Sequence, residues 1–162
     1  MLIRKTTEND MPRVLEIFDV ARKFMRSNGN MNQWVNGYPS ADDIMLDINN
    51  DRSYVVEDEN GELVATFCYF VGTDPTYNEI YNGSWLNDKP YGVVHRIAVE
   101  AQTKGTGSFC INWCFEQCGN LKIDTHADNY PMQNMLKKNG FIQCGIIYLE
   151  SGDERVAFQK SK

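Results

Sequence analysis

Apolar positions along the chain change their spacing from segment to segment, and these changes predict an alternation of strands and helices. Residues 93–99 are a short β-branched apolar run of strand length, and residues 121–125 are predicted to form the strand that follows the next helix. Residues 8–25 carry apolar side chains at helical spacing, whereas residues 108–118 are apolar enough for a largely buried helix. Further strands are predicted at 2–5, 53–57, 63–72, 141–149 and 155–159, and further helices at 40–49 and 131–138.

Turn-forming residues mark the boundaries between these segments. Ser40 is placed to cap the helix that follows it, and Asn60-Gly61 is a hairpin turn signal between two strands. Residues 74–91 differ from the other connections because they are long, irregular and rich in aromatic side chains. An insertion of this kind is either a binding loop or a dimer contact.

The order of the elements is strand, two helices, a three-strand meander, helix, strand, helix and a terminal hairpin. This order predicts an α/β fold, with a mixed (α+β) sheet of about seven strands and helices on its faces. A chain of 162 residues, of which 42% are hydrophobic and 23% charged, fits one soluble domain with a sizeable core. We therefore expect a single domain over residues 1–162.

A glycine loop joins the strand at 93–99 to the buried helix. The start of a helix presents unpaired N–H groups, and Gly105 and Gly107 would let backbone approach an anion without a Cβ in the way, with Lys104 beside them. Such glycines also make tight turns, so the loop alone is weak evidence. A dinucleotide-binding loop is excluded because Cys110 stands where a third glycine or alanine is needed, and a nucleoside-triphosphate loop because Ser108 follows Gly107.

The loop resembles motif A of the GNAT superfamily of N-acetyltransferases, which has Gln/Arg-x-x-Gly-x-Gly/Ala after a strand. Gln102, Gly105 and Gly107 match that motif. A second family motif is matched downstream by Asn129, Met132, Met135, Lys138 and Gly140-Phe141. The resemblance covers residues 93–149 closely and the rest of the chain in the order of its elements.

The resemblance implies acetyl-CoA as co-substrate and a pair of parallel strands that splay apart around its pantetheine arm. Backbone at Ile97 and Val99 would then pair with the pantetheine and the thioester carbonyl, and Asn129 would bond the pantetheine amides. The pyrophosphate would be held by the loop that includes Gln102, Lys104, Gly105, Thr106, Gly107 and Ser108.

The sequence identifies the catalytic acid and base less directly than the residues that bind the co-substrate. Amide formation from a thioester needs a neutral amine, and His95 on the strand before the loop is our candidate base, with His126 as its rival. The tyrosine that protonates the leaving thiolate in relatives would fall at Leu136, which cannot donate a proton. Tyr130, Tyr148 or water would have to replace it, and Tyr148 is our candidate.

Aromatic side chains gather in the two regions that would form the acceptor pocket of a GNAT-like fold. Trp34 and Tyr38 lie between the first two predicted helices, and Tyr81 and Trp85 lie in the 74–91 insertion together with Glu79. These residues predict a partly apolar pocket for a small primary amine, because aromatic faces also stabilise an ammonium group. A homodimer contact is the alternative for the same aromatics, and Trp34 could also be a lid over the core.

We therefore predict an N-acetyltransferase that acts on a small-molecule amine. Two alternatives remain open at this stage: a non-catalytic coenzyme A sensor, because the usual tyrosine is missing, and a protein N-terminal acetyltransferase. The formal net charge of −6 argues against nucleic acid as a partner and suits a cationic acceptor.

No leader-like start or membrane-length apolar segment is evident, so we expect a cytoplasmic protein without a membrane partner. The five cysteines form an odd set without close pairs. Cys110, Cys114 and Cys118 follow one face of the predicted helix, but no histidine is near them in the sequence, so we expect core packing and no metal.

Overall fold

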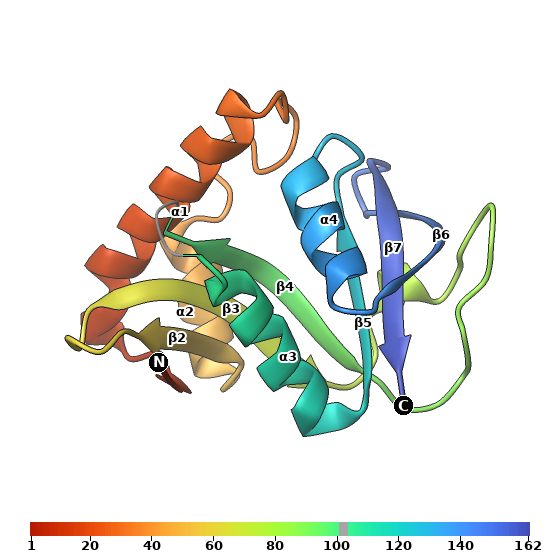
Figure 1. The fold of residues 1–162 in the computed structure, drawn as a ribbon. Helices are drawn as coiled ribbons and strands as arrows, with labels where there is room; N and C mark the ends of the chain where they lie inside the picture. The colour runs from red at the N-terminus through yellow and green to blue at the C-terminus, as the bar shows by residue number, and fades with distance from the viewer. Residues whose placement is uncertain (101–103) are drawn as a thin grey trace.

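The computed structural model describes residues 1–100 and 104–162 and contains a seven-stranded sheet with helices on both faces (Figure 1). The predicted mixed α/β fold is confirmed. The strands are β1 (Leu2–Lys5), β2 (Ser53–Glu57), β3 (Leu63–Val71), β4 (Gly92–Val99), β5 (Asn120–Thr125), β6 (Ile142–Tyr148) and β7 (Glu154–Ser161). The helices are α1 (Met11–Ser27), α2 (Ala41–Asn49), α3 (Thr106–Cys118) and α4 (Tyr130–Lys138), with short 3-10 helices η1 (Glu8–Asp10) and η2 (Pro75–Tyr77).

Local chemistry sets several of these boundaries. The Ser40 hydroxyl accepts a hydrogen bond from the Asp43 amide, and the Asp43 carboxylate accepts one from the Ser40 amide, so α2 starts with the reciprocal cap expected from the sequence. The chain turns at Asn60-Gly61 between β2 and β3, also as expected, and Gly61 has a φ of +79°.

The sheet order is β1-β2-β3-β4-β5-β7-β6, in which β4 and β5 are the parallel neighbours and the other pairs are antiparallel. The parallel register holds only at Gly92 with Leu121 and at Val93 with Lys122. Beyond these two pairs the strands part, and we call the resulting opening the wedge (Figure 1). The splayed pair implied by the resemblance is therefore present.

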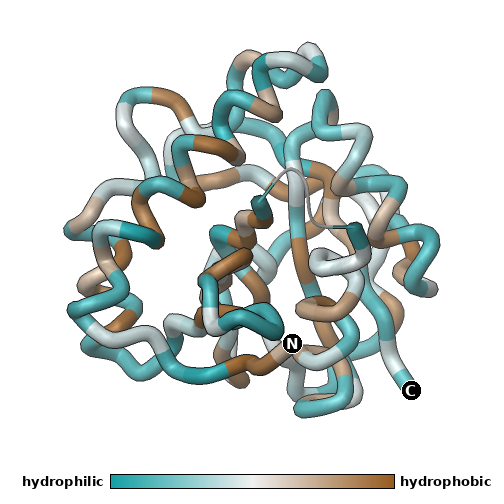
Figure 2. Tube along the Cα trace, turned by 60° about the vertical axis from the view of Figure 1, so that its left-hand side comes forward, coloured by the Kyte–Doolittle hydropathy of each residue, from teal (hydrophilic) through white to brown (hydrophobic). Residues whose placement is uncertain are grey.

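The sheet buries both of its faces, which we call the α3 face and the α1 face. α3 and α4 cover the α3 face, where Val94, Val156 and Phe158 join their core cluster. On the α1 face, α1 and α2 pack over the first strands, while residues 74–91 cover Val93 and Ala157. Neighbouring strand residues belong to different clusters because side chains alternate across a sheet. Hydrophobic and hydrophilic residues likewise alternate along the outer helices (Figure 2).

The thiols of α3 pack as predicted. Cys110 and Cys114 are fully buried in the core of the α3 face, and Cys118 is half-buried. Within residues 1–100 and 104–162, no group of three or more histidine, cysteine or acidic side chains could hold a metal ion. The helices in these same ranges are all too short or too polar to cross a membrane.

Candidate active site

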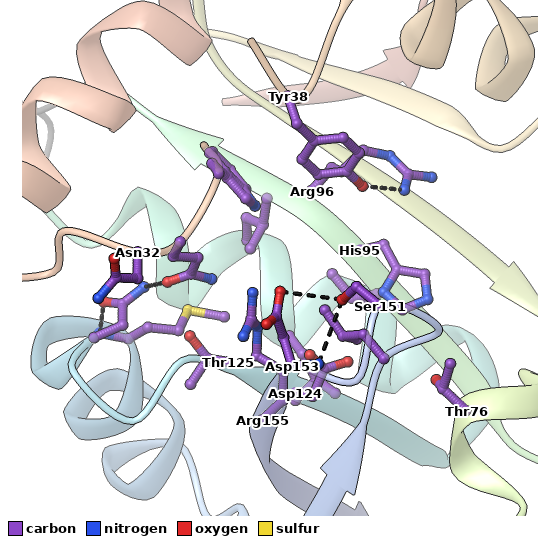
Figure 3. Close-up of a pocket in the computed structure, with 18 of the residues that line it drawn as sticks. Asn32, Tyr38, Thr76, His95, Arg96, Asp124, Thr125, Ser151, Asp153 and Arg155 are labelled. Carbon is purple, nitrogen blue, oxygen red and sulfur yellow. Dashed lines mark hydrogen bonds between the residues drawn. The ribbon is translucent and has the colours of Figure 1, made fainter. Parts of the chain in front are cut away.

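A cavity of about 710 Å3 opens where the wedge meets the α1 face (Figure 3). Five parts of the chain line it: the loop after α1, the start of the 74–91 segment, the middle of β4, the end of β5 with the start of α4, and the β6–β7 turn. The cavity thus collects side chains from segments that are distant in the sequence. Its polar lining includes a histidine, two arginines and four carboxylates.

A β-bulge in β4 forms one wall of this cavity. His95 pairs with Cys68 and Ala98 with Thr66, so that two residues of β4, Arg96 and Ile97, lie opposite the single residue between them on β3. Arg96 has a φ of +51°, a left-handed conformation that is strained for a non-glycine residue. Such a bulge interrupts the ladder and re-aims the backbone, here at the point where β4 leaves β5.

The side chain of Arg96 holds this bulge in place. Its guanidinium donates two hydrogen bonds to the buried carboxylate of Asp47 on α2, at 2.8 and 2.7 Å, and a third to the Tyr38 hydroxyl at 2.9 Å. Burial raises the pKa of Tyr38 despite the nearby arginine, so the phenol stays protonated at neutral pH. Bidentate pairing with a carboxylate compensates for both the backbone strain and the burial of the charge.

His95 lines the cavity and is paired with Asp74 at the start of η2. The distance from His95 Nε2 to Asp74 Oδ2 is 2.6 Å, and Asp74 Oδ1 accepts hydrogen bonds from the amide and hydroxyl of Thr76. Burial alone would raise the pKa of Asp74, but these hydrogen bonds lower it to about 2. An ionised carboxylate can only accept, so Nε2 carries the proton and Nδ1 is the nitrogen free to act as a base.

His126, the rival base, is placed differently. It does not line the cavity, and its Nδ1 accepts a hydrogen bond from the Asp128 amide at 3.0 Å. Burial and the positive charge of Arg155 lower the pKa of His126. The geometry therefore favours His95 as the candidate base.

None of the tyrosines considered as proton donors lines the cavity. Leu136 is fully buried in the core, and Tyr130 is 62% exposed on the outside of α4. Tyr148 lines a separate pocket of about 320 Å3 with Tyr81, and its hydroxyl lies 3.5 Å from Glu154. Tyr148 is therefore not placed to act as the acid, since β6 positions it away from the pair formed by His95 and Asp74.

The glycine loop leads into α3 as predicted. Gly105 is the N-cap with a φ of +79°, and it has no side chain to accept the first N–H groups of the helix, those of Thr106, Gly107 and Ser108. A Cβ built on Gly107 would come no closer than 3.7 Å to another side chain, so the packing of the chain itself does not require glycine there. Lys104 is exposed beside the loop, and the Ser108 hydroxyl accepts a hydrogen bond from Asn139. Gln102 lies outside the described residues.

A model of the Acetyltransferase (GNAT) family matches residues 15–141. The chain belongs to the GNAT acetyltransferase family. GNAT enzymes are acyltransferases that generally use acetyl-CoA as co-substrate, and this chain falls in that enzyme class. A comparison with curated proteins gives no significant match.

Solved structures of GNAT proteins are similar over nearly the whole chain. A GNAT acetyltransferase from Streptococcus agalactiae is 32% identical with a TM-score of 0.91, and the match covers 99% of this chain and 95% of that one. A GNAT acetyltransferase from Listeria monocytogenes has 16% identity and a TM-score of 0.72, over 99% and 94% of the two chains. A ribosomal-protein-alanine N-acetyltransferase from Brucella melitensis has 19% identity and a TM-score of 0.68, over 100% of each. The last two similarities concern the fold alone.

The wedge of this GNAT chain fits an extended ligand with amide groups. Thr125 is 1% exposed and lines the cavity, yet its hydroxyl has no hydrogen-bond partner in the described chain. Ile97 and Asn129 line the same space, and Asn129 caps α4 through a bond from the Met132 amide and donates to Gln33. Val99 lies further along β4, outside the cavity lining. An orphaned hydroxyl beside a gap between strands suits a pantetheine arm, whose amides could satisfy it.

The predicted acceptor residues divide into two groups. Trp34 and Tyr38 line the cavity, and Trp34 packs edge-on against Phe18. Tyr81 lies in the smaller pocket, where its hydroxyl donates to Glu79. Trp85 lines neither pocket: its indole donates to the Tyr77 carbonyl, and its ring covers Lys122. Trp85 therefore does not belong to the acceptor site, because it packs against the core cluster that contains Tyr77 and Val93.

Sequence reasoning missed Asp74, Asp47 and Arg155. A signal existed only for Asp74, since an aspartate before Pro75 is a typical helix cap that orders its loop. Its pairing with His95 spans 21 residues and depends on the fold. Arg155 lines the cavity from the first part of β7, where the sequence indicates only a strand.

Proposed function

We propose that this GNAT enzyme transfers an acetyl group from acetyl-CoA to the primary amine of a small molecule, by direct attack of the amine on the thioester. The observation that carries the proposal is the His95–Asp74 pair, which lines the same cavity as the wedge residues Ile97 and Thr125. A base beside the opening between β4 and β5 is where an incoming amine would have to lose its proton. A cytoplasmic location and the absence of a nucleic-acid partner remain part of this proposal.

His95, Asp74 and the bulge at Arg96 would have separate roles in acetyl transfer. Acetyl-CoA, when bound, supplies an activated acyl group, so no nucleophile from the enzyme is needed. As the C–N bond forms and the C–S bond of the thioester breaks, coenzyme A would leave as its thiolate, which needs no acid from the enzyme. His95 Nδ1 would accept the proton that the amine releases, and Asp74 would hold the ring in the required tautomer and stabilise the resulting imidazolium. The bulge at Arg96 and Ile97 presents backbone at the reacting end of the wedge.

Binding would rely on groups that the fold leaves available. The first N–H groups of α3, from Thr106 to Ser108, would be available to bind an anion, and Lys104 would add a positive charge for the pyrophosphate. Ile97, Thr125 and Asn129 line the wedge for the pantetheine arm. Trp34 and Tyr38 supply apolar contact for the body of the acceptor.

The acceptor end of the cavity supports a small substrate over a protein terminus. The loop at 32–38 and the β6–β7 turn at 149–153 both line it, so the space is walled from two sides. A folded protein would have to thread its terminus between these segments. The coenzyme A sensor remains the second candidate, because the fully buried Leu136 replaces the tyrosine that relatives use as acid.

An acetylation assay tests the proposal. Purified protein is incubated with acetyl-CoA and a panel of small primary amines, or with a peptide that has a free N-terminus, and the acetylated product is measured by mass spectrometry. We expect turnover of small amines with a higher kcat/KM than for the peptide. The reverse order would favour protein acetylation. Acetyl-CoA binding by calorimetry without any turnover would favour the sensor, and no binding would exclude both.

A further inference from the structure

Arg155 is a buried cation that forms no ion pair with residues 1–100 or 104–162. It is 8% exposed and lines the cavity. Its one hydrogen bond within the described chain goes from Nη1 to the carbonyl of the preceding residue, Glu154, at 2.9 Å. A buried guanidinium that lacks a carboxylate is costly, because it has lost water and gained no opposite charge.

None of the charged groups that line the cavity, Glu150 included, forms an ion pair with Arg155 in the described part of the chain. Arg96 is paired with Asp47 and His95 with Asp74. Asp124 accepts a hydrogen bond from the Tyr77 hydroxyl at 2.7 Å, and Asp153 accepts one from Ser151 at 3.0 Å. Among the described residues, no carboxylate oxygen lies within 4 Å of an Arg155 nitrogen.

The position of Arg155 separates it from the proposed phosphate site. Val156 and Phe158 belong to the core of the α3 face, and Ala157 to the core of the α1 face. By the alternation of a strand, Arg155 projects on the side of Ala157, which is also the side of His95. The glycine loop that leads into α3 lies on the opposite face of the sheet. An anion bound by Arg155 would therefore be part of the acceptor and not the pyrophosphate of the coenzyme.

We propose that Arg155 binds the carboxylate of the acceptor, so that the substrate is a free amino acid with its amine directed to His95. This inference rests on the proposed function and narrows its substrate class. A guanidinium matches a carboxylate with two parallel hydrogen bonds. Asp124, Glu150 and Asp153 also line the cavity, and their negative charge favours a singly charged carboxylate over a doubly charged phosphate.

Matched acceptors test the carboxylate directly. The twenty amino acids are screened, and the best acceptor is compared with its amide, which keeps the amine and side chain but has no negative charge. The amine of the amide loses its proton more easily, so a preference for the acid cannot come from amine reactivity. We expect the acid to have the higher kcat/KM by roughly 10- to 100-fold, the range of a charge-assisted pair.

Variants connect that preference to Arg155. Arg155→Met should remove the advantage of the acid, because kcat/KM should fall by much more for the acid than for the amide, whereas Arg155→Lys should retain part of the advantage as a point charge. Lys23→Met, an exposed position on α1, controls for the lost charge. Equal losses for acid and amide would overturn the inference, as would a wild-type enzyme without the preference. If Arg155→Met does not fold, the comparison of acid with amide in the wild-type enzyme and in Arg155→Lys still tests the inference.

A binding measurement separates this inference from the proposed function. Calorimetry in the presence of coenzyme A compares N-acetyl amino acids with their amides and requires no turnover. If the acids bind through Arg155 but no amino acid is acetylated, the carboxylate site stands and the proposed function fails. If acids and amides bind equally, or neither binds, the carboxylate site is wrong whatever the enzyme acetylates.

Discussion

His95 depends on Asp74 for the tautomer that makes it a base, so the two residues should act together. His95→Ala should lower kcat/KM by roughly 100-fold or more, and it should remove the part of the decline at low pH that comes from protonation of this base, because the imidazole at position 95 is gone. Steady-state kinetics over a range of pH would measure both effects. Asp74→Asn should cause a smaller loss, since a neutral amide stabilises the imidazolium less well.

His126→Ala is the matched control for that experiment. It should keep most of the activity, because His126 does not line the cavity. A loss confined to acetyl-CoA affinity in His95→Ala would indicate packing instead of base catalysis. Full activity of His95→Ala at neutral pH would transfer the assignment to His126.

Gly105 and Gly107, the two glycines of the glycine loop before α3, should respond to substitution in different ways. Gly107→Val should weaken acetyl-CoA binding by at least roughly 100-fold, because the added side chain would enter the space needed at the helix start. Its unfolding free energy should change by less than about 0.5 kcal/mol, since valine is a slightly better helix former than glycine and its Cβ has room.

Gly105→Ala is the companion variant. Its φ of +79° makes any other residue strained, so we expect a loss of about 1–2 kcal/mol of unfolding free energy. Calorimetry gives the affinity and urea unfolding gives the stability of each variant. Unchanged acetyl-CoA affinity in a folded Gly107→Val protein would contradict the assignment of this loop to the pyrophosphate.

Sequence reasoning at this scale succeeded where the signal was local. Gly105 and Gly107 lie at the start of α3 as predicted, because the turn into a helix depends on residues that are adjacent in the sequence. The cap position of Asp74 is also a local signal, but its pairing with His95, 21 residues away, is not, and no local signal marks Arg155 as a cavity residue. The catalytic and binding roles of all these residues stay predictions until the variants are measured.

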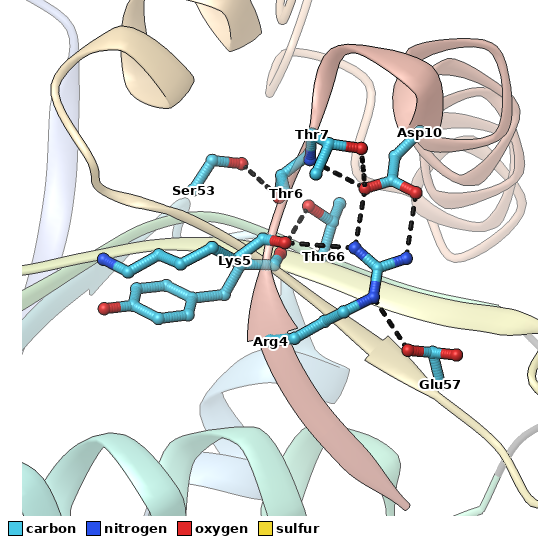
Figure 4. Close-up of polar contacts among 9 residues, drawn as sticks. Arg4, Lys5, Thr6, Thr7, Asp10, Ser53, Glu57 and Thr66 are labelled. Carbon is cyan, nitrogen blue, oxygen red and sulfur yellow. Dashed lines mark hydrogen bonds and ion pairs between the residues drawn. The ribbon is translucent and has the colours of Figure 1, made fainter.

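At the scale of elements, a polar cluster fastens β1 to the start of α1 (Figure 4). The Arg4 guanidinium donates to both carboxylate oxygens of Asp10 at 2.8 and 3.0 Å, and to Glu57 on β2 at 2.7 Å. Asp10 also accepts a bond from the Thr7 amide. The hydrogen bond from Arg4 outweighs burial and lowers the pKa of Asp10 from 3.8 to about 2.

A lowered pKa in the folded state means that the cluster stabilises the protein above about pH 4 and loses this effect as the pH falls toward 2. Asp10→Asn should therefore reduce the unfolding free energy by about 1–2 kcal/mol at pH 6, allowing for partial exposure of Arg4, and by much less near pH 2. Urea unfolding at both values measures the difference. Asp19→Asn, in an exposed pair on α1, should change little at either pH. A loss for Asp10→Asn that is equal at both values would contradict the electrostatic account.

Element order was predictable, but neighbours in the sheet were not. The Ser40 cap and the Asn60-Gly61 turn are readable because they involve residues within four positions. Nothing local indicates that β7 inserts between β5 and β6, or that β4 bulges at Arg96. The bulge depends on Asp47, which lies 49 residues away on α2.

At the scale of the whole molecule, Trp34 decides between an acceptor pocket and a dimer contact. Trp34→Ala should raise the KM for the acceptor by roughly tenfold, with an unchanged KM for acetyl-CoA and an unchanged native mass, because its ring lines the cavity. Kinetics and light scattering provide the measurements. Phe24→Ala, at an exposed position on α1, is the control. Dissociation of an oligomer with normal acceptor kinetics would support the dimer contact instead.

The short parallel register between β4 and β5 makes the sheet a structure in two leaves, β1 to β4 and β5 to β7, joined directly by two residue pairs. α3 packs against both β4 and β5 and so provides a second connection between the two parts of the sheet. A ligand that forms hydrogen bonds to both β4 and β5 would add a further connection between the two parts of the sheet. Its binding energy would then also hold the leaves together, raising the unfolding free energy by about 2.7 kcal/mol at a ligand concentration of 100 Kd. The concentration of substrate would in this way affect the free energy of unfolding of the protein.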